Sequence, residues 1–331
     1  MTMESRTLGR TGRDVSVIGQ GCWQFGGDWG GDVSDQAALD ILTAGADAGV
    51  TFFDTADVYG DGRSERLVGR FIAERRDPSI VVATKMGRRA NPHEPQEYNR
   101  DNFLAWNDRS RENLGVDTLD LVQLHCPPTP VYSDERVYEW LDEMVADGRM
   151  RAYGVSVETV DEALTAMQHE HVASIQIIFN IFRRKPLEQV LPMAAAKGVG
   201  IIARVPLASG LLSGKFSANT TFSADDHRTY NRHGEAFDQG ETFSGVPYEV
   251  GLEAVDRLRG VVPADASMAQ FALRWIIDQP GVTTVIPGAS RVSQAEQNAA
   301  AASLAPLTQE QLAACEQVYD DLIREHVHPR W

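Results

Sequence analysis

The sequence predicts an α/β fold, a (β/α)₈ TIM barrel with an N-terminal β-hairpin and a C-terminal helix. Eight short apolar segments recur along its 331 residues, and amphipathic segments fill the intervals between them. The apolar segments are continuous, which is typical of parallel strands that are covered on both faces. They are VSVIG (15–19), TFFD (51–54), IVVATK (80–85), LDLVQLH (119–125), RAYGVS (151–156), SIQIIF (174–179), GIIARV (200–205) and VTTVIP (282–287).

Turn residues and capping residues divide the rest of the chain into elements. The stretch RTLGRTGRDVSV (6–17) places turn residues between two short extended segments, which predicts a hairpin that closes the bottom of the barrel. Helices are indicated wherever a capping residue precedes apolar residues at helical spacing. Their starts are predicted at Ser34, Ser64, Asp101, Ser133, Thr159, Ser293 and Thr308, the last three as capping boxes.

A doubly wound sheet is the main alternative to the barrel. The barrel is favoured because GQGCWQF (19–25) lacks the third glycine of a dinucleotide-binding fingerprint. No shift in composition marks a linker, so residues 1–331 are expected to form a single domain. The polar segment 216–247 has no periodicity, and a loop that long is usually either functional or disordered.

The composition restricts the partners and the compartment. A net charge of -16 disfavours nucleic acid and anionic membranes, although a locally positive pocket could still hold an anionic ligand. No apolar stretch is long enough to span a membrane. The three cysteines are widely spaced and form no disulfide framework, and the N-terminal segment is polar, so a cytoplasmic location is expected. The histidine pairs at 169–171 and 326–328 lack a third ligand, so no metal site is predicted.

Four polar residues follow the ends of three neighbouring strands. Asp54 ends one strand and Tyr59 follows it, while Lys85 and His125 end the next two. In a barrel these ends meet at one mouth. Asp54 and Lys85 can pair, and the ammonium is expected to lower the phenol's pKa from about 10. Tyr59 could then protonate an oxygen that gains negative charge, and His125 could donate a hydrogen bond to it.

Each of these residues alone also has an ordinary structural interpretation. Asp54 could cap a helix, Tyr59 could pack on the surface, Lys85 could be solvated, and His125 could be a core histidine with its hydrogen bonds satisfied. Their placement at successive strand ends is what favours a catalytic site.

The motifs FFDTADVYG, VVATK and LDLVQLH resemble the aldo-keto reductase superfamily, as found in bacteria, over nearly the whole chain. The resemblance implies a barrel that reduces carbonyl compounds with NADPH, without a metal. It also implies that Asp54, Tyr59, Lys85 and His125 form the catalytic tetrad, with Tyr59 as the general acid. A small-molecule aldehyde or ketone would be the partner; its identity and the self-association of the chain are left open.

The resemblance also implies a set of residues that bind the cofactor. GQGCW places Gly21, Cys22 and Trp23 beside the nicotinamide, near Asp54, and GVS and SIQIIFN place Ser156 and Gln176 at its carboxamide. VPLASGLLSGK would cover the diphosphate. The residues expected to make contact there are Pro206, Leu207, Ser209, Gly210, Leu212 and Lys215.

IPGASRVSQAEQN (286–298) leaves the last strand and enters a helix, and backbone N–H groups at a helix start attract phosphate. Arg291 can bind a 2′-phosphate bidentately, which favours NADPH over NADH; the less favoured alternative is a plain surface arginine. The other residues expected at this end of the cofactor are Gly288, Ser290, Gln294 and Asn298.

Two residues depart from the family pattern. Val157 replaces the usual asparagine after GVS, so one hydrogen bond to the carboxamide is lost or comes from elsewhere. Arg204 stands where many members place an aromatic residue that stacks on the nicotinamide. Its planar guanidinium can also stack, and its charge would disfavour bound NADP⁺.

The expected function is the reversible, NADPH-dependent reduction of aldehydes or ketones to alcohols. One alternative is an NADPH-binding, redox-sensing regulatory subunit with little turnover, since some members of the superfamily act in this way. A further alternative is a metal-dependent barrel hydrolase. Aromatic residues that could line an apolar substrate pocket are Trp23, Phe25, Trp29, Trp106 and Trp331.

Overall fold

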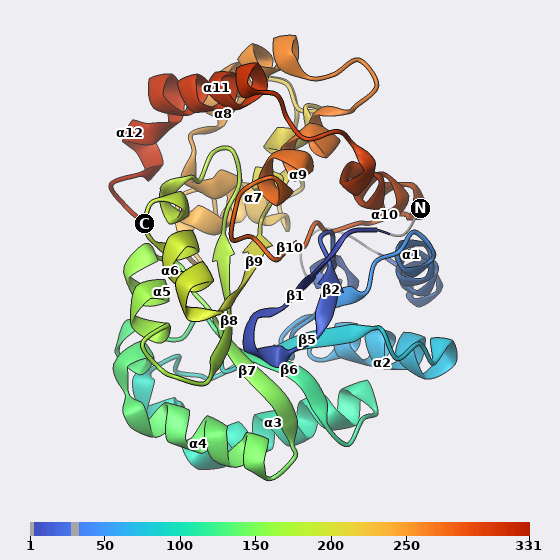
Figure 1. The fold of residues 1–331 in the computed structure, drawn as a ribbon, viewed down its shortest axis with the longest axis vertical. Coiled ribbons are helices and arrows are strands. Elements are labelled where there is room, and N and C mark those ends of the chain that lie inside the picture. Colours follow the sequence, from blue (N-terminus) through green and yellow to red (C-terminus); the bar gives the residue numbers. More distant parts are fainter. Residues whose placement is uncertain (1–2, 28–32) are drawn as a thin grey trace.

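A computed structural model describes residues 3–27 and 33–331, and its core is a barrel of parallel strands (Figure 1). Along the sheet the strands follow chain order from β3 to β10, and every neighbouring pair is parallel. The strands are β3 (Gln20–Gly21), β4 (Phe52–Asp54), β5 (Val81–Met86), β6 (Leu119–His125), β7 (Met150–Ser156), β8 (Val172–Ile178), β9 (Gly200–Arg204) and β10 (Thr284–Val285).

The first and last strands meet and close the sheet. Isolated parallel bridges join Ile18 to Val285 and Gly21 to Gly288. A doubly wound sheet would leave two open edges here, so the closure excludes that alternative. The predicted barrel is confirmed, and the carboxyl ends of the strands meet at one mouth.

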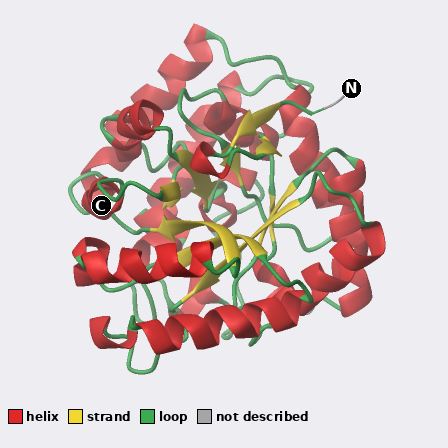
Figure 2. Cartoon of the chain, turned by 60° about the horizontal axis from the view of Figure 1, so that its bottom comes forward, coloured by secondary structure: helices red, strands yellow, loops and turns green. Residues whose placement is uncertain are grey.

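Helices surround the strands, as Figure 2 shows. They are α1 (Asp35–Asp47), α2 (Arg63–Arg75), α3 (Arg100–Leu114), α4 (Glu135–Ala146), α5 (Val160–Ala166), α6 (Val190–Lys197), α7 (His227–Tyr230), α8 (Tyr248–Leu258), α9 (Met268–Ile277), α10 (Val292–Ala300), α11 (Gln309–Val318) and α12 (Arg324–Val327). A π-helical turn, Tyr319–Ile323, joins the last two. In the part of the chain that the structure describes, no helix is long and apolar enough to cross a membrane.

The predicted hairpin is present and closes the bottom of the barrel. Strands β1 (Ser5–Thr7) and β2 (Asp14–Ser16) pair antiparallel, and Leu8 in their connection is completely buried in the barrel interior. Gly9 has a φ of +48°, and a Cβ there would collide with the backbone of Ala173. The expectation that 15–19 forms the first barrel strand is met only in part: Val15 and Ser16 belong to β2 of the hairpin, Ile18 bridges Val285, and β3 spans Gln20–Gly21.

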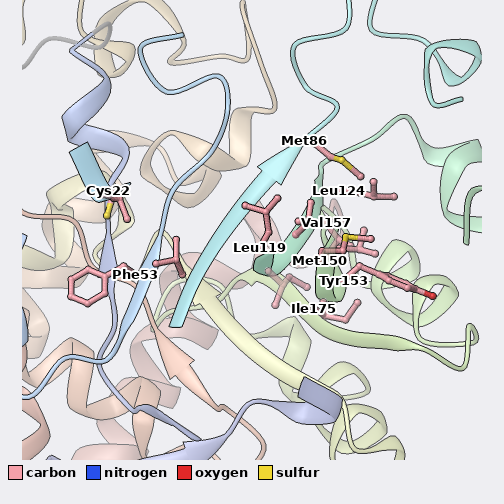
Figure 3. Close-up of a cluster of buried hydrophobic side chains, with 14 of the residues drawn as sticks. Cys22, Phe53, Met86, Leu119, Leu124, Met150, Tyr153, Val157 and Ile175 are labelled. Atoms are coloured by element: carbon pink, nitrogen blue, oxygen red, sulfur yellow. The ribbon is translucent and has the colours of Figure 1, made fainter. Parts of the chain in front are cut away.

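Apolar side chains fill two layers of the barrel. One layer lies inside the strands, where Phe52, Val81 and Leu121 pack beneath Leu8. The other lies between the strands and the surrounding helices, and Figure 3 shows part of it around Phe53. Together these layers hold the strand ends in fixed positions, which a catalytic site requires.

Most predicted helix starts agree with the structure to within two residues. Ser34 caps α1, and capping boxes form at Thr159 and Thr308 as expected. The capping box predicted at Ser293 is wrong, because α10 already begins at Val292 and its N-cap is Arg291, which makes no capping hydrogen bond. Gln294, at the third position of this helix, accepts hydrogen bonds from the backbone N–H and the hydroxyl of Ser290.

The segment 216–247 is packed onto the barrel rather than disordered. It contains α7 and two short 3₁₀ turns, Gln239–Glu241 and Phe243–Gly245. Asn180, just beyond β8, donates a hydrogen bond to the Ser244 hydroxyl at 2.8 Å. The side chain of Trp331 fills the space that a Cβ at Gly245 would need. This segment therefore lies against the same end of the barrel as the strand ends.

Candidate active site

The four residues predicted from the strand ends come together at the mouth of the barrel. The buried Lys85 ammonium donates a hydrogen bond to Asp54 Oδ1 at 2.5 Å and one to the Thr55 carbonyl at 2.9 Å. Its third donor reaches the Tyr59 hydroxyl at 3.2 Å. The rings of Tyr59 and His125 meet edge to face with centroids 5.9 Å apart. A phenol, an ammonium, a carboxylate and an imidazole thus form one connected cluster.

Asp54 is fixed by more than its ion pair. Its second oxygen, Oδ2, accepts hydrogen bonds from Gln176 at 2.8 Å and from Gln123 at 3.1 Å. All of these side chains are almost completely buried. A buried ion pair is stable only when its remaining lone pairs and protons are satisfied, and here the two amides satisfy them. The sequence analysis missed Gln123, although it alternates with His125 along β6 and so shares a face with it.

The Lys85 ammonium affects the phenol as predicted, but the net shift is in the opposite direction. Burial raises the pKa of Tyr59, and the opposing effect of Lys85 does not overcome it. Burial alone would lower the pKa of Lys85, yet Asp54 and Tyr59 keep that pKa above its usual value. At neutral pH Tyr59 is therefore a neutral phenol beside a permanent cation, which is the state that a proton donor needs.

His125 is held as a neutral imidazole. Burial lowers its pKa well below the usual value, and the cations Arg88 and Lys85 lower it further. Within residues 3–27 and 33–331, its Nδ1 has no hydrogen-bond partner. A neutral ring carries one N–H, so it can donate a hydrogen bond to an oxygen at the mouth.

The residues expected beside the nicotinamide lie on β3 and just beyond β10. The amide N–H of Cys22 donates to the Asp54 carbonyl at 2.9 Å, which ties β3 to the tetrad. Trp23 is half-buried, and its ring meets His227 edge to face with centroids 5.2 Å apart. Gly21 bridges to Gly288, where a Cβ would collide with the side chain of Gln24.

The two residues expected at the carboxamide are adjacent but already engaged. The Ser156 hydroxyl donates to Gln176 Oε1 at 3.3 Å, and the amide of Gln176 donates to Asp54. Gln176 therefore links the expected carboxamide position directly to the tetrad.

The segment 206–215 has the tight backbone that a diphosphate site requires. Ala208, Ser209 and Gly210 have positive φ values of 48°, 53° and 100°. The backbone N–H groups of Ala208 and Gly210 donate to the carbonyls of Val205 and Leu207, so they hold this turn together. Leu207 is half-buried and Lys215 is exposed, whereas Pro206 and Leu212 are buried, with Leu212 packed in the core. The Ser209 hydroxyl donates to the Glu241 carbonyl, so segment 216–247 covers this loop.

The start of α10 forms a second site suited to an anion. Arg291 is exposed at the N-cap, and no partner is recorded for its guanidinium among the described residues. Gln294 accepts from the backbone N–H and the hydroxyl of Ser290, while Asn298 donates to the Gly288 carbonyl at 3.2 Å. Nine helical residues follow, so the helix dipole adds positive potential at this end.

A cluster of charges that the sequence analysis missed lies beside the tetrad. Arg204 donates to Glu158 at 2.8 Å and to the Val157 carbonyl at 3.1 Å, and it lies 3.5 Å from Glu241. Arg88 donates to the same Glu241 oxygen at 2.9 Å. Arg204 was thus identified correctly as unusual, but its two carboxylate partners were not. Arg88 and Glu158 each follow the end of a barrel strand by two residues, which was the available signal.

The carboxyl groups of this cluster do not titrate alike. Burial raises the pKa of Glu158, whereas for Glu241 the guanidiniums of Arg88 and Arg204 outweigh burial and lower the pKa. The Cys126 sulfur and one oxygen from each glutamate lie within 4.8 Å of one another, which resembles a set of metal ligands. Burial raises the pKa of the Cys126 thiol, and Arg204 and Arg88 already pair with the two carboxyl groups.

The aromatic residues expected to line a substrate pocket have separate locations. Phe25 is completely buried, and Trp106 packs against Tyr98 and Phe103 in the outer core. Trp331 stacks under the guanidinium of Arg183. Trp29 lies outside the described residues. Of this group only Trp23 follows directly from a strand end at the mouth.

Comparisons with known proteins agree with this geometry. The model of the Aldo/keto reductase family matches residues 17–320. Aldo-keto reductase YhdN of Bacillus subtilis is 31% identical over 299 residues, which cover 89% of this chain and 87% of that protein. A probable voltage-gated potassium channel subunit beta of Oryza sativa is 31% identical over 318 residues, covering 92% and 93%. The crystal structure of an aldo-keto reductase from Klebsiella pneumoniae in complex with NADPH matches with a TM-score of 0.72 and 25% identity, over 96% of both chains.

Proposed function

Because the chain belongs to the aldo/keto reductase family of NAD(P)-dependent oxidoreductases, we propose that it reduces aldehydes or ketones to alcohols with NADPH, and that Tyr59 is the general acid. The observation that carries the proposal is the hydrogen-bonded chain from Asp54 through Lys85 to the Tyr59 hydroxyl. The reaction is reversible in principle, because the same phenol can accept the proton of an alcohol.

Each residue of the tetrad has a distinct role in this proposal. NADPH, when bound, would supply the hydride to the carbonyl carbon. His125 donates a hydrogen bond to the carbonyl oxygen and so orients it. Tyr59 gives its proton to that oxygen as negative charge develops there. Lys85, held by Asp54, then stabilises the phenolate that remains, and the surrounding amides keep the pair in place.

The residues present suit a phosphorylated dinucleotide. The left-handed turn at 208–210 lies in the segment expected to cover a diphosphate, and Arg291 offers a guanidinium to a 2′-phosphate. The bound NADPH in the Klebsiella pneumoniae relative supports the same choice of cofactor. We also propose that residues 1–331 act as one domain in the cytoplasm, consistent with the free cysteines Cys22, Cys126 and Cys315.

Replacing Tyr59 with phenylalanine tests the assignment. Tyr59→Phe removes the proton donor but little volume, so we expect kcat for an aldehyde panel to fall by about 10²–10⁴-fold. The affinity for NADPH, measured by fluorescence titration, should stay within about twofold. Tyr153→Phe makes the same chemical change at a hydroxyl that bonds to Asp142 outside the mouth, and it should keep its activity. Full activity of the Tyr59 variant would contradict the proposal.

A regulatory subunit that binds NADPH is a second candidate, favoured by the similarity to the potassium channel subunit of Oryza sativa. The two functions differ in turnover. NADPH oxidation with a broad panel of aldehydes and ketones separates them, since a reductase consumes NADPH in multiple turnovers. Tight NADPH binding without turnover on any compound would favour the sensor. A complete and connected tetrad supports the reductase.

A further inference from the structure

Building on the proposed reductase function, we propose that the natural substrate carries a carboxylate besides its carbonyl group, and that the Arg88 guanidinium binds this carboxylate. The nearer alternatives for the same space are a neutral hydroxylated chain and an apolar chain. Three properties of Arg88 favour the carboxylate: its position, its unused donors and the net charge around it.

Arg88 is placed to meet a group attached to the carbonyl carbon. It follows Lys85 by three residues, just beyond the end of β5, and a quarter of its side chain is exposed. Glu241, which accepts a hydrogen bond from Arg88, has a carboxylate oxygen within 4.8 Å of the sulfur of Cys126, the residue after His125. A substrate whose oxygen is oriented by His125 therefore has Arg88 beside it.

Most of the hydrogen-bonding capacity of Arg88 is unused. A guanidinium has five N–H donors. Among the described residues only Glu241 accepts a hydrogen bond from Arg88, through Nη1, and the ring of Phe237 lies 5.7 Å from its central carbon. By contrast, Arg204 is held by Glu158 and by the Val157 carbonyl. One Arg204 donor, Nε, also lacks a partner among the described residues, but only 10% of that side chain is exposed, against 25% for Arg88. Arg88 is thus the arginine of this cluster whose spare donors a substrate can reach, and a carboxylate suits its planar fork.

The charges around the site leave a net positive charge for an anion to neutralise. Arg88 and Arg204 are both cations. The carboxyl groups of Glu158 and Glu241 lie within 4.8 Å of each other, and two carboxyls that close share a proton rather than ionise together. Lys85 and Asp54 cancel each other. The wall beside His125 therefore carries about one positive charge on a chain whose net charge is -16.

Two matched pairs of aldehydes test this inference on the unmodified enzyme with NADPH. The pairs are 4-carboxybenzaldehyde with its methyl ester, and 4-oxobutanoate with its methyl ester, so size is nearly constant within each pair. We expect kcat/KM to be about ten- to a hundredfold higher for the acid, mainly through KM, as for a charge-assisted hydrogen bond. Equal or higher values for both esters would overturn the inference and leave the reductase function standing. Absence of turnover with every compound would instead overturn the reductase function.

Variants of Arg88 test whether this residue causes the preference for the acid over the ester. Arg88→Gln should lower the acid-to-ester ratio about tenfold or more, and Arg88→Lys should retain part of it because the charge remains. Arg100→Gln removes an exposed arginine that pairs with Glu143, and it should leave the ratio unchanged. An unchanged ratio in Arg88→Gln would overturn the inference.

Inhibition of the unmodified enzyme provides a test that does not depend on folding of a variant. Benzoate should compete with a neutral aldehyde ester at least tenfold more strongly than benzamide, which has the same shape without the charge. Equal inhibition by the two compounds would overturn the inference.

Discussion

Asp57 is a buried carboxyl without a hydrogen bond, two residues before the proposed acid. Among the described residues neither of its oxygens has a hydrogen-bond partner, and the nearest guanidinium atom, Arg89 Nη1, lies 3.9 Å away. Burial and then Glu65 raise its pKa, Arg89 and Arg109 oppose them, and the resulting pKa is about 7. Its backbone N–H donates to the Lys85 carbonyl, so it is part of the turn that carries Tyr59.

The raised pKa makes Asp57 a source of pH-dependent instability. The folded state binds this proton more tightly than the unfolded chain does, so stability falls as pH rises from about 4 through 7. Asp57→Asn should therefore raise the free energy of unfolding at pH 8, by on the order of 4 kcal/mol as an upper figure for a shift of about three pKa units. The gain should shrink steadily as pH falls toward 4. Denaturant unfolding followed by circular dichroism at several pH values measures it.

Asp61 provides the matched control for this experiment. It is exposed, and Arg109 lowers its pKa, so its carboxylate is favoured in the folded state. Asp61→Asn should give no stabilisation at pH 8. A gain at pH 8 that persists unchanged at pH 4 for Asp57→Asn would show that relief of a buried charge is not its cause.

The sequence predicts site residues that are marked by a repeating pattern, but it does not predict contacts that form only when distant segments pack together. Asp54, Lys85 and His125 end apolar runs, so their convergence follows from the barrel topology alone. The partners of Arg204 come from two separate segments, Glu158 beyond β7 and Glu241 in 216–247. No spacing in the sequence relates those segments. Likewise the sign of the Tyr59 pKa shift depends on how deeply the ring is buried, which a sequence does not reveal.

Among the elements, the start of α10 is the one that we expect to determine the choice of cofactor. Arg291 is exposed there, beside backbone N–H groups and the positive end of a nine-residue helix. The helix begins within one residue of its predicted start, although the capping box does not form. The N-cap falls at Arg291, and this leaves its side chain free of a structural role in the helix.

Arg291→Ala should weaken the binding of NADPH about ten- to a hundredfold, because a charge-assisted contact to the 2′-phosphate is lost. NADH lacks that phosphate, so its affinity should stay the same. Fluorescence titration with both cofactors measures the two affinities. Arg151→Ala removes an arginine that pairs with Asp120 away from α10, and it should change neither. A parallel loss for both cofactors would contradict this role.

At the scale of the whole molecule, segment 216–247 and Trp331 hold the mouth together. Trp331 stacks on Arg183 with the guanidinium carbon 3.9 Å from its ring, and its indole N–H donates to Asp238 at 3.0 Å. Arg183 in turn donates to the Ser244 carbonyl. The end of the described chain therefore fastens a segment that also supplies Glu241 to the charged wall.

Trp331→Ala should loosen this segment without unfolding the barrel. We expect limited proteolysis within 216–247 to become several-fold faster, and the melting temperature to fall by several degrees, because the lost ring is buried. Trp331→Phe keeps a ring for the arginine and should show a smaller effect. Identical cleavage rates in all three proteins would mean that Trp331 does not restrain the segment.

The fold as a whole was more predictable than the mouth. Eight apolar runs and their order identify the barrel because each run needs cover on both faces. The first strand was misplaced because the apolar run 15–19 combines residues buried in the hairpin with residues buried in the barrel. Segment 216–247 carries no periodicity, so its packing against Asn180 and Trp331 could not be anticipated.

The β1–β2 hairpin closes one end of the barrel with Leu8, so cofactor, substrate and product must reach and leave Tyr59 through the opposite end. When two molecules share one entrance, the molecule that binds deeper must bind first and leave last. A dinucleotide that lies against β3 and β10, beneath the carbonyl substrate, would occupy the deeper position. Steady-state kinetics should accordingly show a compulsory order, with the nucleotide as the first to arrive and the last to depart.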